Sequence, residues 1–214
     1  MHPGVSTRTD WVAWHRDYQD PASQLSGRLR VVQDQLRLAL PIGPREPVQV
    51  ISLCAGRGDD LIEVLRDYPY AGVVRARLVE LDPRNVAAMS ASAQAAGLRL
   101  DIVQGDAAEP SFYEGFVPAD VVLLCGVLGN ISERDVQLTI ASLPQLCRTG
   151  GTVIWTRTRR APDLTPQVRR WFAASGFSEL AFVAPGDALW SVGAARFDGE
   201  PGPLGSRRLF TFNH

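Results

Sequence analysis

The stretch VQVISLCAGRGDD, residues 48–60, decides the fold. It begins with a short β-rich run, Val48–Leu53, and continues into a loop that holds two glycines, Cys54–Gly58. Glycine is needed where a backbone turns sharply or lies close to a ligand. A helical run follows, and Asp60 with Glu63 fits the pattern of a capping box. The stretch predicts a strand, a turn and a helix. An ordinary strand-to-helix turn gives a similar pattern, so the loop alone does not identify a ligand.

Strand-like and helical runs alternate outward from this stretch. The strand-like runs are Val48–Leu53, Val73–Leu81, Leu98–Val103, Asp120–Leu124 and Gly151–Thr156. The helical runs are Asp60–Asp67, Pro83–Ala96, Glu133–Leu146 and Thr165–Ser175. The connection Ala107–Pro118 is short and holds at most one helical turn. This alternation predicts parallel strands joined by right-handed crossovers.

The pattern changes after Gly176, where three strand-like runs follow one another without a helix. These runs are Ser178–Ala184, Trp190–Phe197 and Arg208–Phe212. Strands joined without a crossover helix pair antiparallel. We therefore predict an α/β fold: a doubly wound, mostly parallel seven-stranded sheet that ends in an antiparallel C-terminal hairpin.

The segment before the first strand, residues 10–40, is predicted to be helical. One face carries five apolar residues, Leu25, Leu29, Val32, Leu36 and Leu40, and the prolines Pro41, Pro44 and Pro47 then end the helix. No repeat or long linker divides the chain. We predict one domain over residues 1–214, with an N-terminal helical lid (1–45) and a Rossmann-like core (46–214).

Composition narrows the class of protein. The 214 residues are 45% hydrophobic and carry a formal net charge of −1, which suits one globular domain and gives no pull toward nucleic acid or membranes. All 22 basic residues are arginine, which excludes a Walker-type lysine and a Schiff-base lysine. The three cysteines are widely spaced and predict neither a disulfide nor a metal site. The chain shows no signal peptide and no membrane-spanning run, so we expect a soluble, cytoplasmic protein.

The glycine loop is a poor site for a pyrophosphate. Asp59 and Asp60 lie at the start of the next helix, where a pyrophosphate needs unneutralised amides. Leu61 also occupies the third position of the dinucleotide fingerprint, which requires a small residue. S-adenosylmethionine carries an ammonium, a carboxylate and a sulfonium but no phosphate. The loop therefore favours S-adenosylmethionine over NAD.

The ends of the later strands supply further cofactor candidates. Glu80 and Asp82 both have suitable spacing for the ribose hydroxyls, and Leu81 between them is placed to pack on an adenine face. Asp82 precedes Pro83 and is the natural N-cap of the following helix, which leaves Glu80 for the ribose. Asp106, after Gly105, either accepts from the adenine amino group or forms an ordinary turn.

The fourth strand ends in Cys125-Gly126-Val127-Leu128-Gly129-Asn130. Its two glycines indicate close approach of the backbone to a ligand. Asn130 is a candidate contact to the acceptor or to the cofactor.

These strand ends, in order, resemble the motifs of class I S-adenosylmethionine-dependent methyltransferases over residues 48–158. The phrases WHRDYQDP, SLCAGRGDDL, RARLVELDPRNVAAM, LLCGVLGNI and GGTVIWTRTRRAPDL together resemble a family of small actinobacterial members, over nearly the whole chain. The resemblance implies that Cys54, Ala55, Gly56, Gly58 and Glu80 hold the amino-acid and ribose parts of the cofactor, and Asp106 and Ala107 its adenine. Two positions depart from the family pattern: Ser52 stands where an acid is usual, and Cys54 where the first glycine is usual.

The acceptor site is less well marked. Trp11, Trp14, His15 and Tyr18 share one helical face, which either packs against the sheet or forms a lid with aromatic walls. His15 is the best candidate base, since the other two histidines lie at the chain ends; Tyr18 and Asp17 are weaker candidates.

Arg157 follows the fifth strand and is either a ligand for an acceptor carboxylate or phosphate, or a solvated side chain. A metal-dependent catechol-type enzyme needs acids after strands four and five, where this chain has Asn130 and Arg157.

Together these features predict an S-adenosylmethionine-dependent methyltransferase that acts on a small molecule, as a monomer or homodimer. A nucleic-acid base methyltransferase is disfavoured, because the fourth strand lacks the Asn/Asp-Pro-Pro-aromatic signature and no basic face is evident. Three alternatives stay open: a non-catalytic cofactor-binding protein, an enzyme of the same fold with other chemistry, and an NAD-dependent oxidoreductase.

Overall fold

The computed structural model describes residues 23–44, 46–186 and 188–213. Its centre is one seven-stranded sheet in the order β3-β2-β1-β4-β5-β7-β6. The strands are β1 (Val48–Leu53), β2 (Val74–Glu80), β3 (Asp101–Gln104), β4 (Ala119–Leu124), β5 (Cys147–Thr158), β6 (Phe177–Val183) and β7 (Trp190–Phe197). The pairs among β1 to β5 are parallel, whereas β7 runs antiparallel to both β5 and β6. The predicted mixed sheet with an antiparallel C-terminal hairpin is confirmed.

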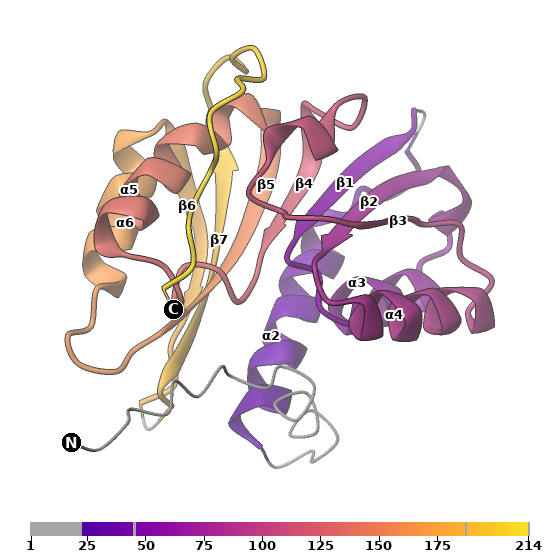
Figure 1. Ribbon diagram of the computed structural model, residues 1–214, viewed down its shortest axis with the longest axis horizontal. Helices are drawn as coiled ribbons and strands as arrows, with labels where there is room; N and C mark the ends of the chain where they lie inside the picture. Colours follow the sequence, from indigo (N-terminus) through magenta and orange to yellow (C-terminus); the bar gives the residue numbers. More distant parts are fainter. Residues whose placement is uncertain (1–22, 45, 187, 214) are drawn as a thin grey trace, which may run out of the picture.

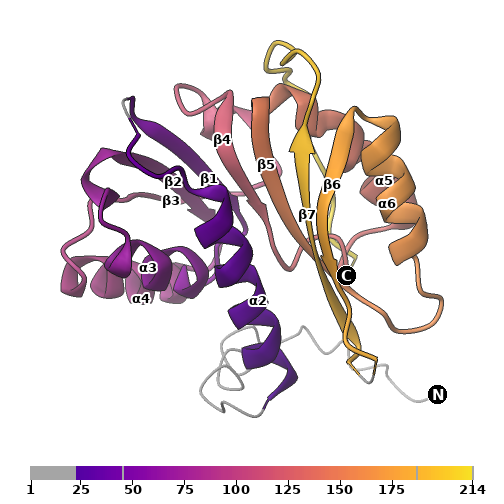
Figure 2. The same ribbon diagram turned by 180° about the vertical axis from the view of Figure 1, so that it is seen from behind.

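Helices cover both faces of the sheet, as Figures 1 and 2 show from opposite sides. One apolar core joins the sheet to α2 (Gln24–Ala39), α3 (Asp59–Asp67) and α4 (Pro83–Ala95). A second core joins the other face to α5 (Glu133–Ser142), α6 (Thr165–Ala174) and the 3₁₀ turn η3 (Pro110–Tyr113). Two further 3₁₀ turns are η2 (Ala71–Val73) and η4 (Leu143–Gln145). No helix in the described ranges is long and apolar enough to cross a membrane.

Several element ends differ from the sequence prediction. The third strand begins at Asp101 rather than Leu98, because the Leu98 amide donates to the carbonyl of Ala93 (2.9 Å) and closes α4. Helix α5 ends at Ser142 and passes into η4, since Pro144 has no amide proton to continue the helix. The single helical turn expected within residues 107–118 is confirmed as η3.

Two predictions near helix starts are corrected. Helix α3 begins at Asp59 after the left-handed Gly58, which has no side-chain cap, so the capping box at Asp60 is wrong. Asp60 instead accepts a hydrogen bond from the Leu61 amide (2.8 Å). Helix α2 begins only at Gln24, because Ser23 is extended and caps it; residues 10–22 of the predicted helix lie outside the described ranges.

The predicted strand Arg208–Phe212 is also wrong. The segment makes one isolated bridge, between Phe212 and Ile131, and otherwise lies across loops. Leu209 and Phe210 are consecutive and both buried, whereas the side chains of a strand alternate between its two faces.

Gly193 of β7 brings the hairpin against β5. A Cβ atom built there would lie 2.2 Å from the Trp155 ring, so the indole occupies the space of the missing side chain. The Trp155 ring also stacks on Phe172 of α6, with centroids 5.5 Å apart. This contact fixes how the hairpin meets the parallel part of the sheet.

Candidate functional site

The loop after β1 turns back through three left-handed residues. Cys54, Gly56 and Gly58 have φ angles of 54°, 58° and 69°. Glycine adopts this conformation without a Cβ clash, but Cys54 does not, and a non-glycine residue there is strained by about 1–2 kcal/mol. The backbone at Cys54 thus has a conformation that glycine adopts more readily.

Glu80, the last residue of β2, holds this loop in place. Its Oε2 accepts a hydrogen bond from the Gly56 amide (2.8 Å), and its Oε1 accepts one from the Asp82 amide (2.9 Å). Asn85 Nδ2 lies 3.5 Å from the same Oε1, and the side chain is 9% exposed. Oε2 has only the Gly56 amide as a donor among the described residues, so Glu80 retains acceptor capacity, chiefly on Oε2.

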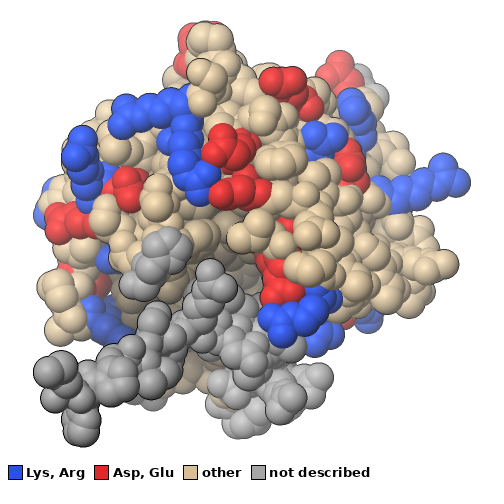
Figure 3. Space-filling model, viewed as in Figure 1, with Lys and Arg blue, Asp and Glu red and all other residues tan. Residues whose placement is uncertain are grey.

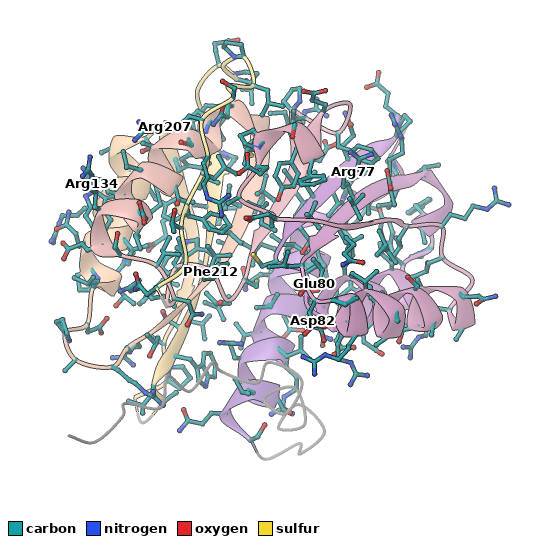
Figure 4. All side chains as sticks on the ribbon, viewed as in Figure 1. Arg77, Glu80, Asp82, Arg134, Arg207 and Phe212 are labelled. Atoms are coloured by element: carbon teal, nitrogen blue, oxygen red, sulfur yellow. The ribbon has the colours of Figure 1, made fainter. Side chains whose placement is uncertain are left out.

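Asp82 plays the structural part that the sequence indicates. It is the N-cap of α4, its Oδ1 accepts from the Arg84 amide (2.9 Å), and its carboxylate pairs with the Arg84 guanidinium. The hydrogen bond from Arg84 lowers the pKa of Asp82 to about 2. Figure 4 shows Glu80 and Asp82 one above the other at the end of β2.

The loop after β3 lies beside this carboxylate. The Gly105 amide donates to the Glu80 carbonyl (2.9 Å), and a Cβ atom at Gly105 would lie 2.4 Å from the Phe112 ring. The Asp106 side chain forms a local turn, in which its Oδ1 accepts a hydrogen bond from the Ala108 amide (3.0 Å). Ala107 is buried, and its carbonyl accepts from the Tyr113 hydroxyl (2.7 Å).

The loop after β4 completes the same edge. Gly126 is left-handed (φ 75°), and its amide donates to the Thr156 hydroxyl of β5 (2.8 Å). Asn130 Nδ2 donates to the Gly126 carbonyl (2.7 Å), so this side chain closes its own loop. Cys125 is half-buried just ahead of the turn. The carboxyl ends of β1 to β4 thus meet at one edge, where open α/β sheets bind ligands.

The charges at this edge are unusual in two respects. Burial raises the pKa of the Cys54 and Cys125 thiols well above their ordinary value, so both are neutral thiols. Burial, with a smaller contribution from Asp59, raises the pKa of Asp60 to about 6, against a lowering effect of Arg28. Neither thiol is suited to act as a nucleophile.

Leu81 lies 65% exposed directly after Glu80. The packing of Leu81 on an adenine ring stays a prediction.

Arg157, at the end of β5, is 9% exposed, so the interpretation as a solvated side chain is wrong. Its guanidinium donates to the Leu128 carbonyl beneath the β4 loop. Burial lowers its pKa, while Asp163 and Glu133 act in the opposite direction. The remaining acceptor candidates, Trp11, Trp14, His15, Asp17 and Tyr18, lie outside the described residues.

The sequence prediction missed one residue of this edge. Arg208 pairs with Asp106 across a separation of 102 residues. Arg208 lies in a run that predicts a strand, and no local pattern indicates that it meets the third strand's loop.

The charged surface around the edge is mixed. Figure 3 shows Asp and Glu side chains beside Arg side chains on this face.

Comparison with known proteins agrees with the fold. A family model described as a methyltransferase domain matches residues 50–151. The magnesium protoporphyrin IX methyltransferase of Synechocystis PCC 6803, solved with bound S-adenosylmethionine, superposes with a TM-score of 0.66 at 14% identity, over 92% of this chain and 100% of that one. The fold is that of the class I methyltransferases.

A second methyltransferase structure covers almost the whole chain. The 1,6-didemethyltoxoflavin-N1-methyltransferase of Burkholderia thailandensis, solved with bound 1,6-didemethyltoxoflavin and S-adenosylhomocysteine, has a TM-score of 0.60 at 18% identity, over 93% of this chain and 94% of that one. In sequence, a 5-methyltetrahydropteroyltriglutamate–homocysteine methyltransferase of Burkholderia thailandensis is 29% identical over 138 residues, or 57% of this chain. The chain spans 18% of the length of that curated relative.

Proposed function

We propose that this protein is an S-adenosylmethionine-dependent methyltransferase that transfers a methyl group to a small-molecule acceptor. The observation that carries the proposal is Glu80, a buried carboxylate at the end of β2 that braces the left-handed β1 loop. A carboxylate with acceptor capacity at this position suits the two ribose hydroxyls of the cofactor. Two relatives of this fold were solved with S-adenosylmethionine or S-adenosylhomocysteine bound.

The cofactor contacts that we propose lie on the four loops already described. The β1 loop (Cys54, Ala55, Gly56 and Gly58) and the β4 loop (Cys125, Gly126 and Asn130) receive the amino-acid part, and Glu80 receives the ribose. Leu81, Asp106 and Ala107 receive the adenine. The backbone supports this assignment, because its left-handed residues leave room for a close ligand.

We assign the acceptor side to Arg157, Trp11 and Trp14, with His15 or Tyr18 as the acid–base group. Bound S-adenosylmethionine supplies an already activated methyl group. The residues of this chain therefore act chiefly by aligning the acceptor and excluding water. Arg157 supports this role, because it is a buried cation at the ligand edge of the sheet.

A thermal-shift titration tests the cofactor. S-adenosylhomocysteine at a hundred times its Kd stabilises the native state by about 2.7 kcal/mol, whereas NAD is expected to give no shift. The Glu80→Ala variant is expected to lose the shift, and the matched Asp82→Ala variant, which loses a helix cap and an ion pair with Arg84, to retain it. Stabilisation by NAD alone would overturn the proposal.

An enzyme and a non-catalytic cofactor-binding protein can be distinguished by whether S-adenosylmethionine is consumed. Incubation of the protein with S-adenosylmethionine and small-molecule extracts releases S-adenosylhomocysteine only if an acceptor is methylated. An NAD-dependent oxidoreductase is disfavoured by Asp59 and Asp60, which both lie in the first turn of α3. A cytoplasmic location, membership of the actinobacterial family, and a monomeric or homodimeric state are part of the same proposal.

A further inference from the structure

The C-terminal segment lies along the cofactor edge. Residues 206–213, here named the C-terminal strap, run past the loops after β3 and β4 (Figure 1, yellow). The Leu209 amide donates to the Ala108 carbonyl (2.8 Å), and the Asn213 amide donates to the Asn130 carbonyl (2.9 Å). The strap therefore touches both the loop assigned to adenine and the loop assigned to the amino-acid part.

The strap is fixed by burial rather than by sheet pairing. Leu209 and Phe210 are both buried in the core that holds α5 and α6. The Thr139 hydroxyl of α5 lies within hydrogen-bond distance of both the Leu209 carbonyl (2.9 Å) and the Asp135 carbonyl (2.6 Å). Arg208 directly precedes these two buried residues, so burial of Leu209 and Phe210 also fixes the backbone position of Arg208.

Arg208 spans two carboxylates of the β3 loop. Its Nη2 lies 2.6 Å from Asp106 Oδ2, and its Nη1 lies 2.5 Å from Glu109 Oε1. Asp106 Oδ1 is held separately by the Ala108 amide. Both oxygens of Asp106 are thus oriented, and each keeps a lone pair for one further donor.

We propose that Arg208 is a positioning residue of the cofactor site, which holds the Asp106 carboxylate so that it selects a 6-aminopurine over a 6-oxopurine. This inference rests on the proposed function. A fixed carboxylate accepts from a 6-amino group, whereas a 6-oxo group presents a lone pair to it and is repelled.

An exposed ion pair usually contributes little, because two long side chains must be ordered. Here the side chains are about 40% exposed, but the strap is anchored on buried neighbours and the carboxylate on a backbone amide. Forming the Arg208–Asp106 ion pair therefore costs less conformational entropy than an ordinary exposed ion pair does, and the pair restrains the orientation of the Asp106 carboxylate more effectively.

The test measures binding of S-adenosylhomocysteine and of S-inosylhomocysteine, its 6-oxo analogue, by calorimetry. Arg208→Met is expected to weaken S-adenosylhomocysteine binding about fivefold, the loss of one charge-assisted contact, and to leave the analogue unchanged. Arg208→Lys is expected to restore part of the preference. Arg207→Met is the matched control; Figure 4 shows Arg207 near the top of the strap, far from Glu80.

A double-mutant cycle distinguishes an effect of Arg208 on the Asp106 carboxylate from a general effect of Arg208 on folding. If Arg208 acts through Asp106, Asp106→Asn combined with Arg208→Met loses no more of the purine preference than Asp106→Asn alone. Equal weakening of both ligands by Arg208→Met, or an unchanged preference, overturns the inference and leaves the proposed function standing. Absence of S-adenosylhomocysteine binding by the unaltered protein instead overturns the proposed function, and the inference with it.

Discussion

Replacing Asp60 by asparagine is expected to stabilise the protein at neutral pH. Asp60 lies in the first turn of α3, half-buried, and burial raises its pKa to about 6. The folded state therefore binds the proton more tightly than the unfolded chain, whose Asp pKa is near 3.8. The free energy of unfolding falls as pH rises from about 4 to about 6, and the full cost of the charge is present above pH 6.

The magnitude follows from the two pKa values. A difference of about 2 pH units corresponds to about 3 kcal/mol at most. The side chain keeps some contact with water, and its charge interacts favourably with the helix N-terminus, worth about 0.5 kcal/mol. A net gain of about 1–2 kcal/mol is expected for Asp60→Asn, whose amide oxygen still accepts from the Leu61 amide.

Urea unfolding at pH 7.5 and pH 4.5 measures this effect. The difference between Asp60→Asn and the unaltered protein is expected at pH 7.5 and should shrink at pH 4.5, with equal m-values. The matched control is Asp59→Asn, since Asp59 lies 3.8 Å from Arg57 in an ion pair. A variant that is less stable at pH 7.5, or a difference that does not change with pH, would refute the reasoning.

Three further predictions concern stability, each measured by thermal unfolding. Cys54→Gly should change the free energy of unfolding by less than about 0.5 kcal/mol, because relief of the strain in the left-handed Cys54 backbone offsets the lost side-chain packing. Cys54→Val should lower the free energy of unfolding by about 1–2 kcal/mol. Equal effects of the two substitutions would contradict this prediction. Gly193→Ala should cost about 2–3 kcal/mol, since its Cβ meets Trp155; a neutral result would place the ring elsewhere. Gly58→Ala should be similarly costly, because φ is positive and Met89 Sδ lies 2.9 Å from the new Cβ.

Local patterns predicted those parts of the site that local forces determine. Asp82 is an N-cap because Pro83 follows it, and both residues lie side by side in the sequence. The N-cap at Asp82 leaves Glu80 as the ribose candidate, and the Glu80 carboxylate accepts a hydrogen bond from the Gly56 amide in the glycine loop. The mixed sheet could be predicted because strands joined by crossover helices pair parallel, whereas strands joined without a helix pair antiparallel.

Contacts between residues far apart in the sequence could not be predicted from local patterns. Arg208 and Asp106 meet only because two buried neighbours in the strap fix its path across the molecule. An apolar run near the chain end suits an edge strand and a buried strap equally well, and only the partner surface decides between them. The burial of Arg157 depends in the same way on the β4 loop that covers it.

The hydrogen bond from the Gly56 amide to Glu80 gives the proposed ribose site a spectroscopic reporter. An amide proton donated to a carboxylate is shifted downfield and exchanges slowly with solvent. Hydroxyl groups that share the same carboxylate draw on its electron density and move that resonance. One backbone NMR signal, followed during a cofactor titration, then reports occupancy of the site without any acceptor present.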